Sequence, residues 1–174
     1  MRTKTQNLAI AGVCLALCMV VPFLTGQIPQ IGAMLSPMHI PVLLCGMLCG
    51  WSYGLAVGFI APLLRSVLFG MPAIMPSGVG MAFEPATYGV VSGVLVKRLP
   101  KKLPWLYLSL IGAMLTGRIV WGIARFALGA LVGPAFTLEA FMAGAFLNAI
   151  PGIVLHILLI PPIVIALRKA IRQD

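Results

Sequence analysis

The residues of this chain that can do chemistry are a small set of ionisable and amide side chains inside long apolar segments. An ionisable group there costs several kcal/mol, on the order of 3 or more, unless it has a partner or water. Guanidinium, carboxylate, imidazole and amide groups that converge can bind a polar ligand. The set consists of His39, Arg65, Glu84, Arg118, Arg125, Glu139, Asn148 and His156.

These residues do not form a catalytic or metal-binding pattern. No histidine or acid pair occurs at the spacing of metal ligands, and no nucleophile is set beside a base. The cysteines form two i, i+4 pairs inside apolar runs, a spacing typical of packing residues rather than of a disulfide framework or a zinc site: Cys14, Cys18, Cys45 and Cys49. We predict no catalytic residues, no bound metal and no cofactor.

The elements that position the polar set are membrane helices. Hydrophobic residues make up 61% of the chain and charged residues 9%, and the mean hydropathy is +1.09, which lies outside the range of soluble domains. The net charge of +9 does not indicate nucleic-acid binding, because the basic residues stand where spans end and lipid headgroups begin. The sequence predicts an all-α integral membrane protein in the lipid bilayer.

Basic residues fix the predicted topology. They cluster at Arg2 and Lys4, in the 97–102 loop, and at 168–172, and basic residues that flank spans stay on the cytoplasmic side. Both termini and the 97–102 loop are therefore expected inside. The chain is predicted to be a single domain, 1–174, that forms a compact bundle of six transmembrane helices, at about 8–24, 39–50, 55–69, 78–96, 105–132 and 138–167.

This topology places most of the polar set at or outside the midplane of the membrane, which predicts an outward-facing polar cavity and import of a ligand. Two alternatives stay open for the charged members: Arg65 with Glu84, and Arg125 with Glu139, could bind ligand or form internal ion pairs. His39 could touch ligand or cap the second helix. Trp121 could stack on a ligand ring or fill core.

Connections and small residues complete the prediction. Residues 25–38 carry no charge and form either a lid over the bundle or a plain connector, and Trp51 to Gly54 are expected to form a turn. Pro151 and the pair Pro161-Pro162 should bend the last helix. No phosphate-cradling glycine-rich loop occurs, so ATP hydrolysis must come from a partner if transport is driven.

Three segments carry a family resemblance: PMHIPVLL-x-G at the second span, the third span ending in LLRSVLFGMP, and MAFEPATYG at the fourth. With six spans in a short chain, they resemble the substrate-binding S components of energy-coupling factor (ECF) vitamin transporters of the bacterial cell membrane, in the subgroup of riboflavin, folate, pantothenate and hydroxymethylpyrimidine or pyridoxine carriers. The resemblance covers the whole chain.

The resemblance implies a vitamin pocket near the outer face, lined by spans four to six and closed by the loop after span one. It implies docking of the first helix on a membrane scaffold subunit driven by two ATPase subunits. The nearest match to the docking motif of small residues is Gly12 with Ala16. The predicted substrate-binding residues are His39, Arg65, Glu84, Trp121, Arg125 and Asn148.

A small heterocycle of the pyridoxine or hydroxymethylpyrimidine type suits these residues better than riboflavin or folate, with Glu84 accepting from a ring amine and Asn148 or Arg125 meeting oxygens. Two other classes compete with this hypothesis. A channel or structural membrane subunit predicts ion conductance or no small-molecule binding, and an intramembrane enzyme requires a nucleophile and base that the sequence does not offer.

Overall fold

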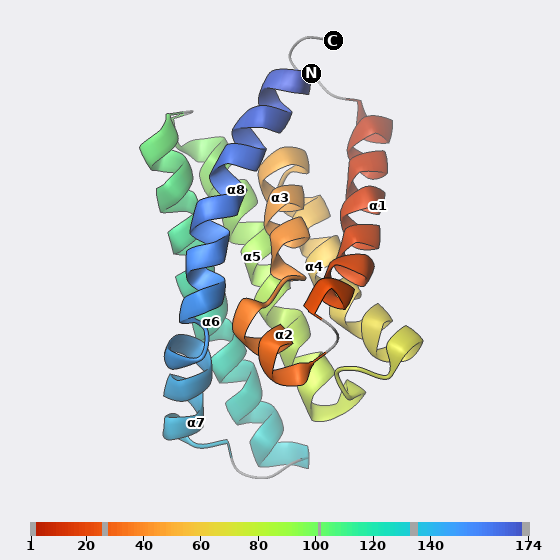
Figure 1. Ribbon diagram of the computed structural model, residues 1–174, viewed down its shortest axis with the longest axis vertical. Coiled ribbons are helices and arrows are strands. Elements are labelled where there is room, and N and C mark those ends of the chain that lie inside the picture. Colours follow the sequence, from red (N-terminus) through yellow and green to blue (C-terminus); the bar gives the residue numbers. More distant parts are fainter. Residues whose placement is uncertain (1–2, 26–27, 101, 133–135, 172–174) are drawn as a thin grey trace.

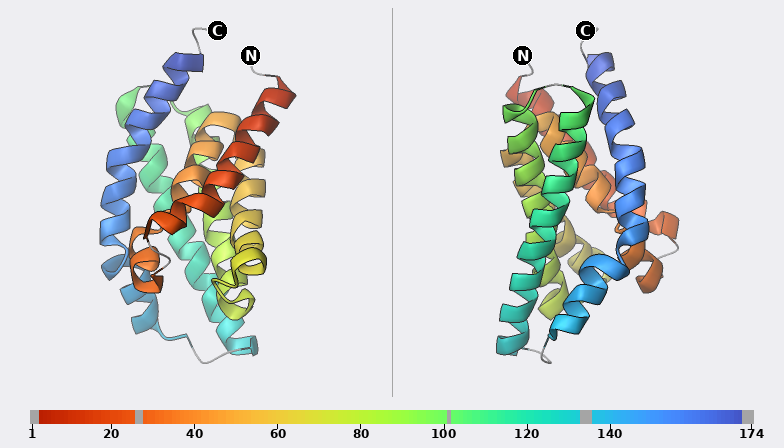
Figure 2. Two further views of the ribbon diagram at one scale, coloured as in Figure 1. Left: turned by 45° about the vertical axis from the view of Figure 1, so that its right-hand side comes forward. Right: turned by 90° about the vertical axis from the view of Figure 1, so that its left-hand side faces the viewer.

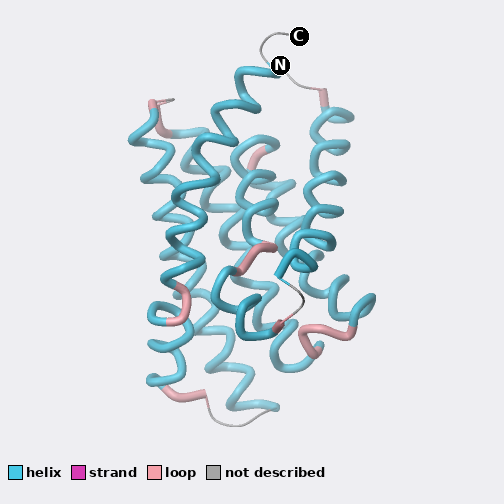
Figure 3. Tube along the Cα trace, in the orientation of Figure 1, coloured by secondary structure: helices cyan, strands magenta, loops and turns pink. Residues whose placement is uncertain are grey.

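Helices form every regular element of the part of the chain that the computed structural model describes, residues 3–25, 28–100, 102–132 and 136–171. Figure 1 shows them as one elongated bundle, and Figure 3 shows the loops that join them. In chain order they are α1 (Lys4–Val20), the 3-10 turn Val21–Thr25, α2 (Pro29–Leu35), α3 (His39–Cys49), α4 (Trp51–Phe69), the π-turn Ile74–Gly78, α5 (Val79–Arg98), α6 (Leu103–Val132), α7 (Leu138–Met142), the π-turn Ala143–Leu147 and α8 (Ile150–Ile171).

The start of α1, the end of α8 and the connection from α5 to α6 lie at one end of the bundle (Figure 1). We call it the basic end, because Lys4, Lys97, Arg98, Lys102 and Arg168 belong to these segments. At the opposite, far end lie the connection from α4 to α5, the end of α6 and the start of α7. The predictions for Arg2, Lys101 and Arg172 concern residues outside the described part of the chain.

Five helical segments are long and apolar enough to cross a membrane, namely Lys4–Leu24, Trp51–Phe69, Val79–Arg98, Leu103–Leu131 and Leu138–Lys169. The span predicted at 39–50 corresponds to α3, which has only 11 residues. That is about 16 Å of helix, against a hydrocarbon core of about 30 Å. Helix α3 begins at His39, a buried residue, after the chain has passed through α2 (Figure 1).

One predicted boundary is wrong. The segment from Trp51 to Gly54 is not a turn but the first turn of α4. Gly50, with φ at 102°, reverses the chain by itself, since glycine adopts this backbone region without a steric penalty. The last predicted span is interrupted at Asn148 and Ala149, ahead of Pro151, and Figure 2 shows that α7 and α8 run in different directions. The helix continues through Pro161 and Pro162.

The segment between α1 and α3 folds back over the bundle as α2. A Cβ atom added at Gly152, in the first turn of α8, would lie 2.5 Å from the carbonyl oxygen of Met34 and 3.0 Å from that of Leu35. The end of α2 thus rests directly on the backbone of α8. This contact agrees with the expectation that residues 25–38 lie against the bundle.

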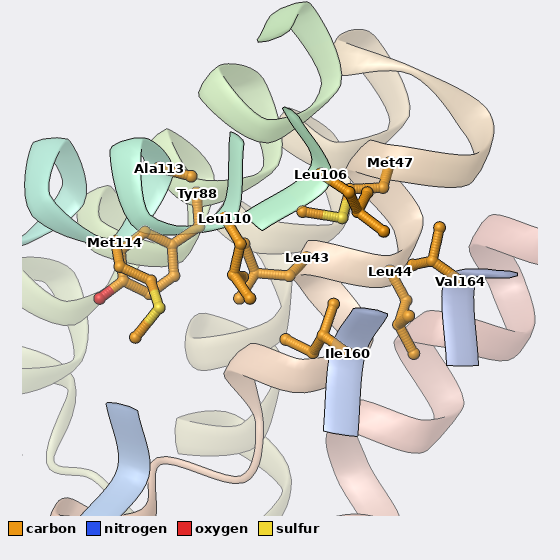
Figure 4. Close-up of a cluster of buried hydrophobic side chains, with 10 residues drawn as sticks. All are labelled: Leu43, Leu44, Met47, Tyr88, Leu106, Leu110, Ala113, Met114, Ile160 and Val164. Carbon is orange, nitrogen blue, oxygen red and sulfur yellow. The ribbon is translucent and has the colours of Figure 1, made fainter. Parts of the chain in front are cut away.

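The core near the basic end is apolar and joins α3, α5, α6 and α8 (Figure 4). A fully buried Tyr88 marks its boundary toward the far end, where polar residues begin. The cluster consists of Leu43, Leu44, Met47, Tyr88, Leu106, Leu110, Ala113, Met114, Ile160 and Val164.

Candidate functional site

A buried ion pair joins α5 to α6 inside the bundle. Arg118 Nε lies 3.2 Å from Glu84 Oε1, and the two residues expose 7% and 2% of their surfaces. The Nε–H of Arg118 does not point at an acceptor among the described residues, so the contact is an ion pair by distance rather than an aligned hydrogen bond. The acid that we expected to pair with Arg65 is therefore paired with Arg118.

Glu84 also accepts a hydrogen bond from Tyr88, one helical turn along α5. The Tyr88 hydroxyl donates to Glu84 Oε1 over 2.6 Å, a length typical of a hydrogen bond to a charged oxygen. The neighbouring α6 makes room for the phenol ring with Gly117, where a Cβ atom would overlap the ring. The i, i+4 spacing of Glu84 and Tyr88 and a glycine beside Arg118 thus build the cluster.

Two histidines extend the cluster toward α3 and α8. The His39 ring meets Tyr88 edge-on, with centroids 5.0 Å apart, and lies 6.1 Å from the ring of His156. His39 is 2% exposed, yet neither of its ring nitrogens has a hydrogen-bond partner among the described residues. Helix α3 has no side-chain cap, so His39 does not cap it. We call Glu84, Tyr88, Arg118, His39 and His156 the polar core.

An unpartnered buried imidazole is costly, since each unpaired polar group in a low-dielectric interior loses its interaction with water. Such a group in a native structure requires a reason. The members of the polar core expose at most 7% of their surfaces, so the expected outward-facing cavity is closed at this depth. The arrangement can offer the unpartnered nitrogens of His39 to a polar ligand.

A second cluster lies between α6 and the segment from Phe136 through the π-turn Ala143–Leu147. Trp121 stacks on Phe141, with centroids 6.2 Å apart and ring planes at 27°, and meets Phe136 edge-on at 5.5 Å. Glycines let the rings approach: a Cβ atom at Gly144 would lie 3.0 Å from the Trp121 ring. We call this set the aromatic group; it consists of Trp121, Phe126, Phe136, Phe141 and Phe146.

Arg125 lies beside the aromatic group, farther along α6 than Arg118 of the polar core. It follows Trp121 by one turn of α6, and its guanidinium carbon is 5.2 Å from the centroid of Phe136. Its stem rests on α5, because a Cβ atom at Gly80 would be 2.9 Å from Arg125 Cδ. Arg125 Nε is buried and has no hydrogen-bond partner among the described residues.

The structure does not bring the other predicted site residues to these clusters. Arg65 donates to the carbonyl oxygen of Met19 over 3.1 Å and lies against Phe23 and Phe69, between α4 and the end of α1. Glu139 and Asn148 are exposed, and no ion pair between Arg125 and Glu139 forms among the described residues. The alternative that these two form an internal pair is therefore wrong.

Sequence reasoning missed Tyr88 as a member of the site. It recognised Arg118 and His156 as intramembrane polar residues but did not count them among the substrate-binding residues. The signal for Tyr88 was available, because it stands four residues after Glu84 and so on the same helix face. No sequence signal identified Arg118 as the partner of Glu84, because sequence gives the depth of a residue along a helix but not which side of the helix faces a given neighbour.

Comparison with known proteins identifies the family of the chain. A family model described as "ECF transporter, substrate-specific component" matches residues 6–164. No curated protein and no solved structure matches the chain. The matched range contains the polar core and the aromatic group. It overlaps all five of the membrane-length segments. This multi-pass membrane protein, a transport subunit rather than an enzyme, therefore belongs to the substrate-specific components of ECF transporters.

Proposed function

We propose that the protein binds a B vitamin or a vitamin precursor on the outer side of a bacterial cell membrane. It passes the ligand inward together with a scaffold subunit and two ATPase subunits. The observation that carries the proposal is the pairing of a buried polar core with an adjacent aromatic group on the same face of α6. This combination supplies hydrogen bonds for ring substituents and a stacking surface for the ring itself.

A small heterocycle of the pyridoxine or hydroxymethylpyrimidine type fits this site better than riboflavin or folate. Tyr88 and Arg118 both contact Oε1 of Glu84, so Oε2 is the oxygen that we expect to accept from a ring amine. Trp121 is only partly buried and offers ring surface to a ligand one helical turn from Arg118 and Arg125. The unpartnered nitrogens of His39 are available to ligand hydroxyl groups.

Equilibrium binding of purified protein to a panel of B vitamins and precursors tests the substrate. We expect saturable binding of a small pyridine or pyrimidine compound. Tight binding of riboflavin or folate alone would reject the proposed substrate type. Ion conductance in reconstituted bilayers without binding of any panel member would favour the channel alternative.

The proposed docking on a scaffold subunit rests on the exposed face of α1. Gly12 and Ala16 are exposed there, and a Cβ atom at Gly12 would meet nothing within 4 Å. We expect Gly12→Leu and Ala16→Leu to abolish uptake by cells and to leave ligand binding by the purified protein unchanged. Val13→Leu is the matched control, because Val13 is 60% exposed on the same helix and is already large. Equal uptake by all three variants would exclude this docking surface.

A further inference from the structure

The three arginines within the membrane helices differ in how their charges are compensated. Arg118 is paired with Glu84. Arg65 donates to a backbone carbonyl and lies over two rings, with its guanidinium carbon 5.6 Å from Phe23 and 5.3 Å from Phe69. Arg125 contacts one ring, and its buried Nε has no acceptor among the described residues.

Neither of the two described acidic side chains pairs with Arg125. The sequence contains three acids. Glu84 is committed to Arg118 and Tyr88, and Glu139 is exposed on α7 and pairs with no described residue. The third acid, Asp174, lies outside the described residues. Arg125 belongs to the last third of α6, toward the far end.

The surroundings of Arg125 favour a ligand that has a planar ring and a negatively charged group. Gly80 holds the aliphatic stem against α5, so the guanidinium is directed from a fixed base. Trp121 stands one turn away on the same face of α6, beside Phe141 and Phe136. An arginine so placed binds a carboxylate or phosphate through two parallel hydrogen bonds.

We propose that the ligand is an anionic heteroaromatic compound: its carboxylate or phosphate group binds Arg125, and its ring lies along Trp121. This inference rests on the proposed function and narrows it from small heterocycles in general to those with a negative charge. The ion pair of Arg118 with Glu84 adds no net charge to the site, so the ligand anion is the counterion of Arg125. A neutral analogue leaves that arginine uncompensated.

Matched pairs of an acid and its neutral analogue test the inference on purified protein. The pairs are nicotinate with nicotinamide, 4-pyridoxate with pyridoxine, and hydroxymethylpyrimidine phosphate with hydroxymethylpyrimidine. For the pair that binds, we expect the acid to bind about 10- to 100-fold more tightly, the range for hydrogen bonds to a charged group. The phosphate pair separates phosphate recognition from carboxylate recognition.

Variants assign the preference to Arg125. Arg125→Gln should remove the advantage of the acid over its neutral analogue, and Arg125→Lys should keep part of that advantage. Arg65→Gln is the matched control and should keep the full advantage of the acid over its neutral analogue. Thermal unfolding and gel filtration verify that each variant is folded.

The possible failures are distinguishable. A neutral analogue that binds as tightly as its acid overturns the inference and leaves the proposed function standing, as does a preference that survives in folded Arg125→Gln. Binding of no compound in these pairs or in the vitamin panel overturns both.

Discussion

The two sides of α5 pack by opposite means. On the side toward α3 and α4, backbones touch: a Cβ atom at Gly54 would lie 2.7 Å from the carbonyl oxygen of Gly89, and one at Gly93 would lie 2.6 Å from the amide nitrogen of Trp51. On the side toward α6, side chains fill the contact, and two of them are Glu84 and Tyr88. The first side is a seam of glycines, and the second is a polar contact.

The difference shows where the bundle can respond to a ligand. Helices in lipid pack closely through small residues, because lipid supplies no hydrophobic drive. The glycine seam uses this effect and consists mainly of backbone contacts. The polar contact is held by side chains whose charges and hydrogen bonds can be exchanged for those of a ligand. The three predictions that follow test this contrast, starting with the largest expected effect.

Gly89→Leu should prevent folding. A Cβ atom at this position overlaps the backbone of Gly54, and backbone cannot move aside as a flexible side chain can. We expect loss of monodisperse protein after extraction in detergent, measured by gel filtration. Gly12→Leu is the matched control, since a Cβ atom there meets nothing within 4 Å, and it should fold normally. A Gly89→Leu protein as monodisperse as this control would show that the seam is not close-packed.

Arg118→Leu should weaken the fold without abolishing it. The substitution leaves Glu84 buried without its counterion, and breaking a buried pair in this way costs about 3–5 kcal/mol. We expect a clear drop in the thermal unfolding midpoint, with most of the loss recovered in the double variant Glu84→Gln, Arg118→Leu, because no charge is then left unpaired. A double variant less stable than Arg118→Leu would contradict the role of this pair.

Arg65→Gln should have the smallest effect. It removes the hydrogen bond to Met19 and the contacts with Phe23 and Phe69, which are worth about 1–3 kcal/mol together. Stability should fall modestly in thermal unfolding, and ligand affinity should stay within about twofold, because Arg65 belongs to the α1–α4 side. A loss of affinity above tenfold would extend the ligand site to that side.

Hydropathy and charge predicted much of the fold. The apolar runs gave most of the helices, and the basic residues marked segments that lie at one end of the bundle. Local conformations were harder to predict: α4 begins directly after the positive φ of Gly50, and the break at Asn148 precedes a proline in a run that is otherwise apolar. These features depend on which backbone groups tertiary contacts satisfy.

The sequence predicted how deep the polar residues of the candidate site lie in the membrane, but not which of them pair. Glu84 belongs to α5, and the helices of Arg65 and Arg118 both adjoin α5, so sequence could not identify which arginine pairs with Glu84. The structure chooses Arg118, because Gly117 brings that turn of α6 against Tyr88. Which of the six predicted residues bind ligand stays a prediction.

The contact of α2 with Gly152 has a mechanical consequence. Because the carbonyl oxygens of Met34 and Leu35 occupy the space of a missing side chain, α2 cannot lift from the bundle without uncovering the first turn of α8. That turn directly follows the break at Asn148 and Ala149. A displacement of α2 would therefore change the packing of α8 next to the point where the regular helix is interrupted.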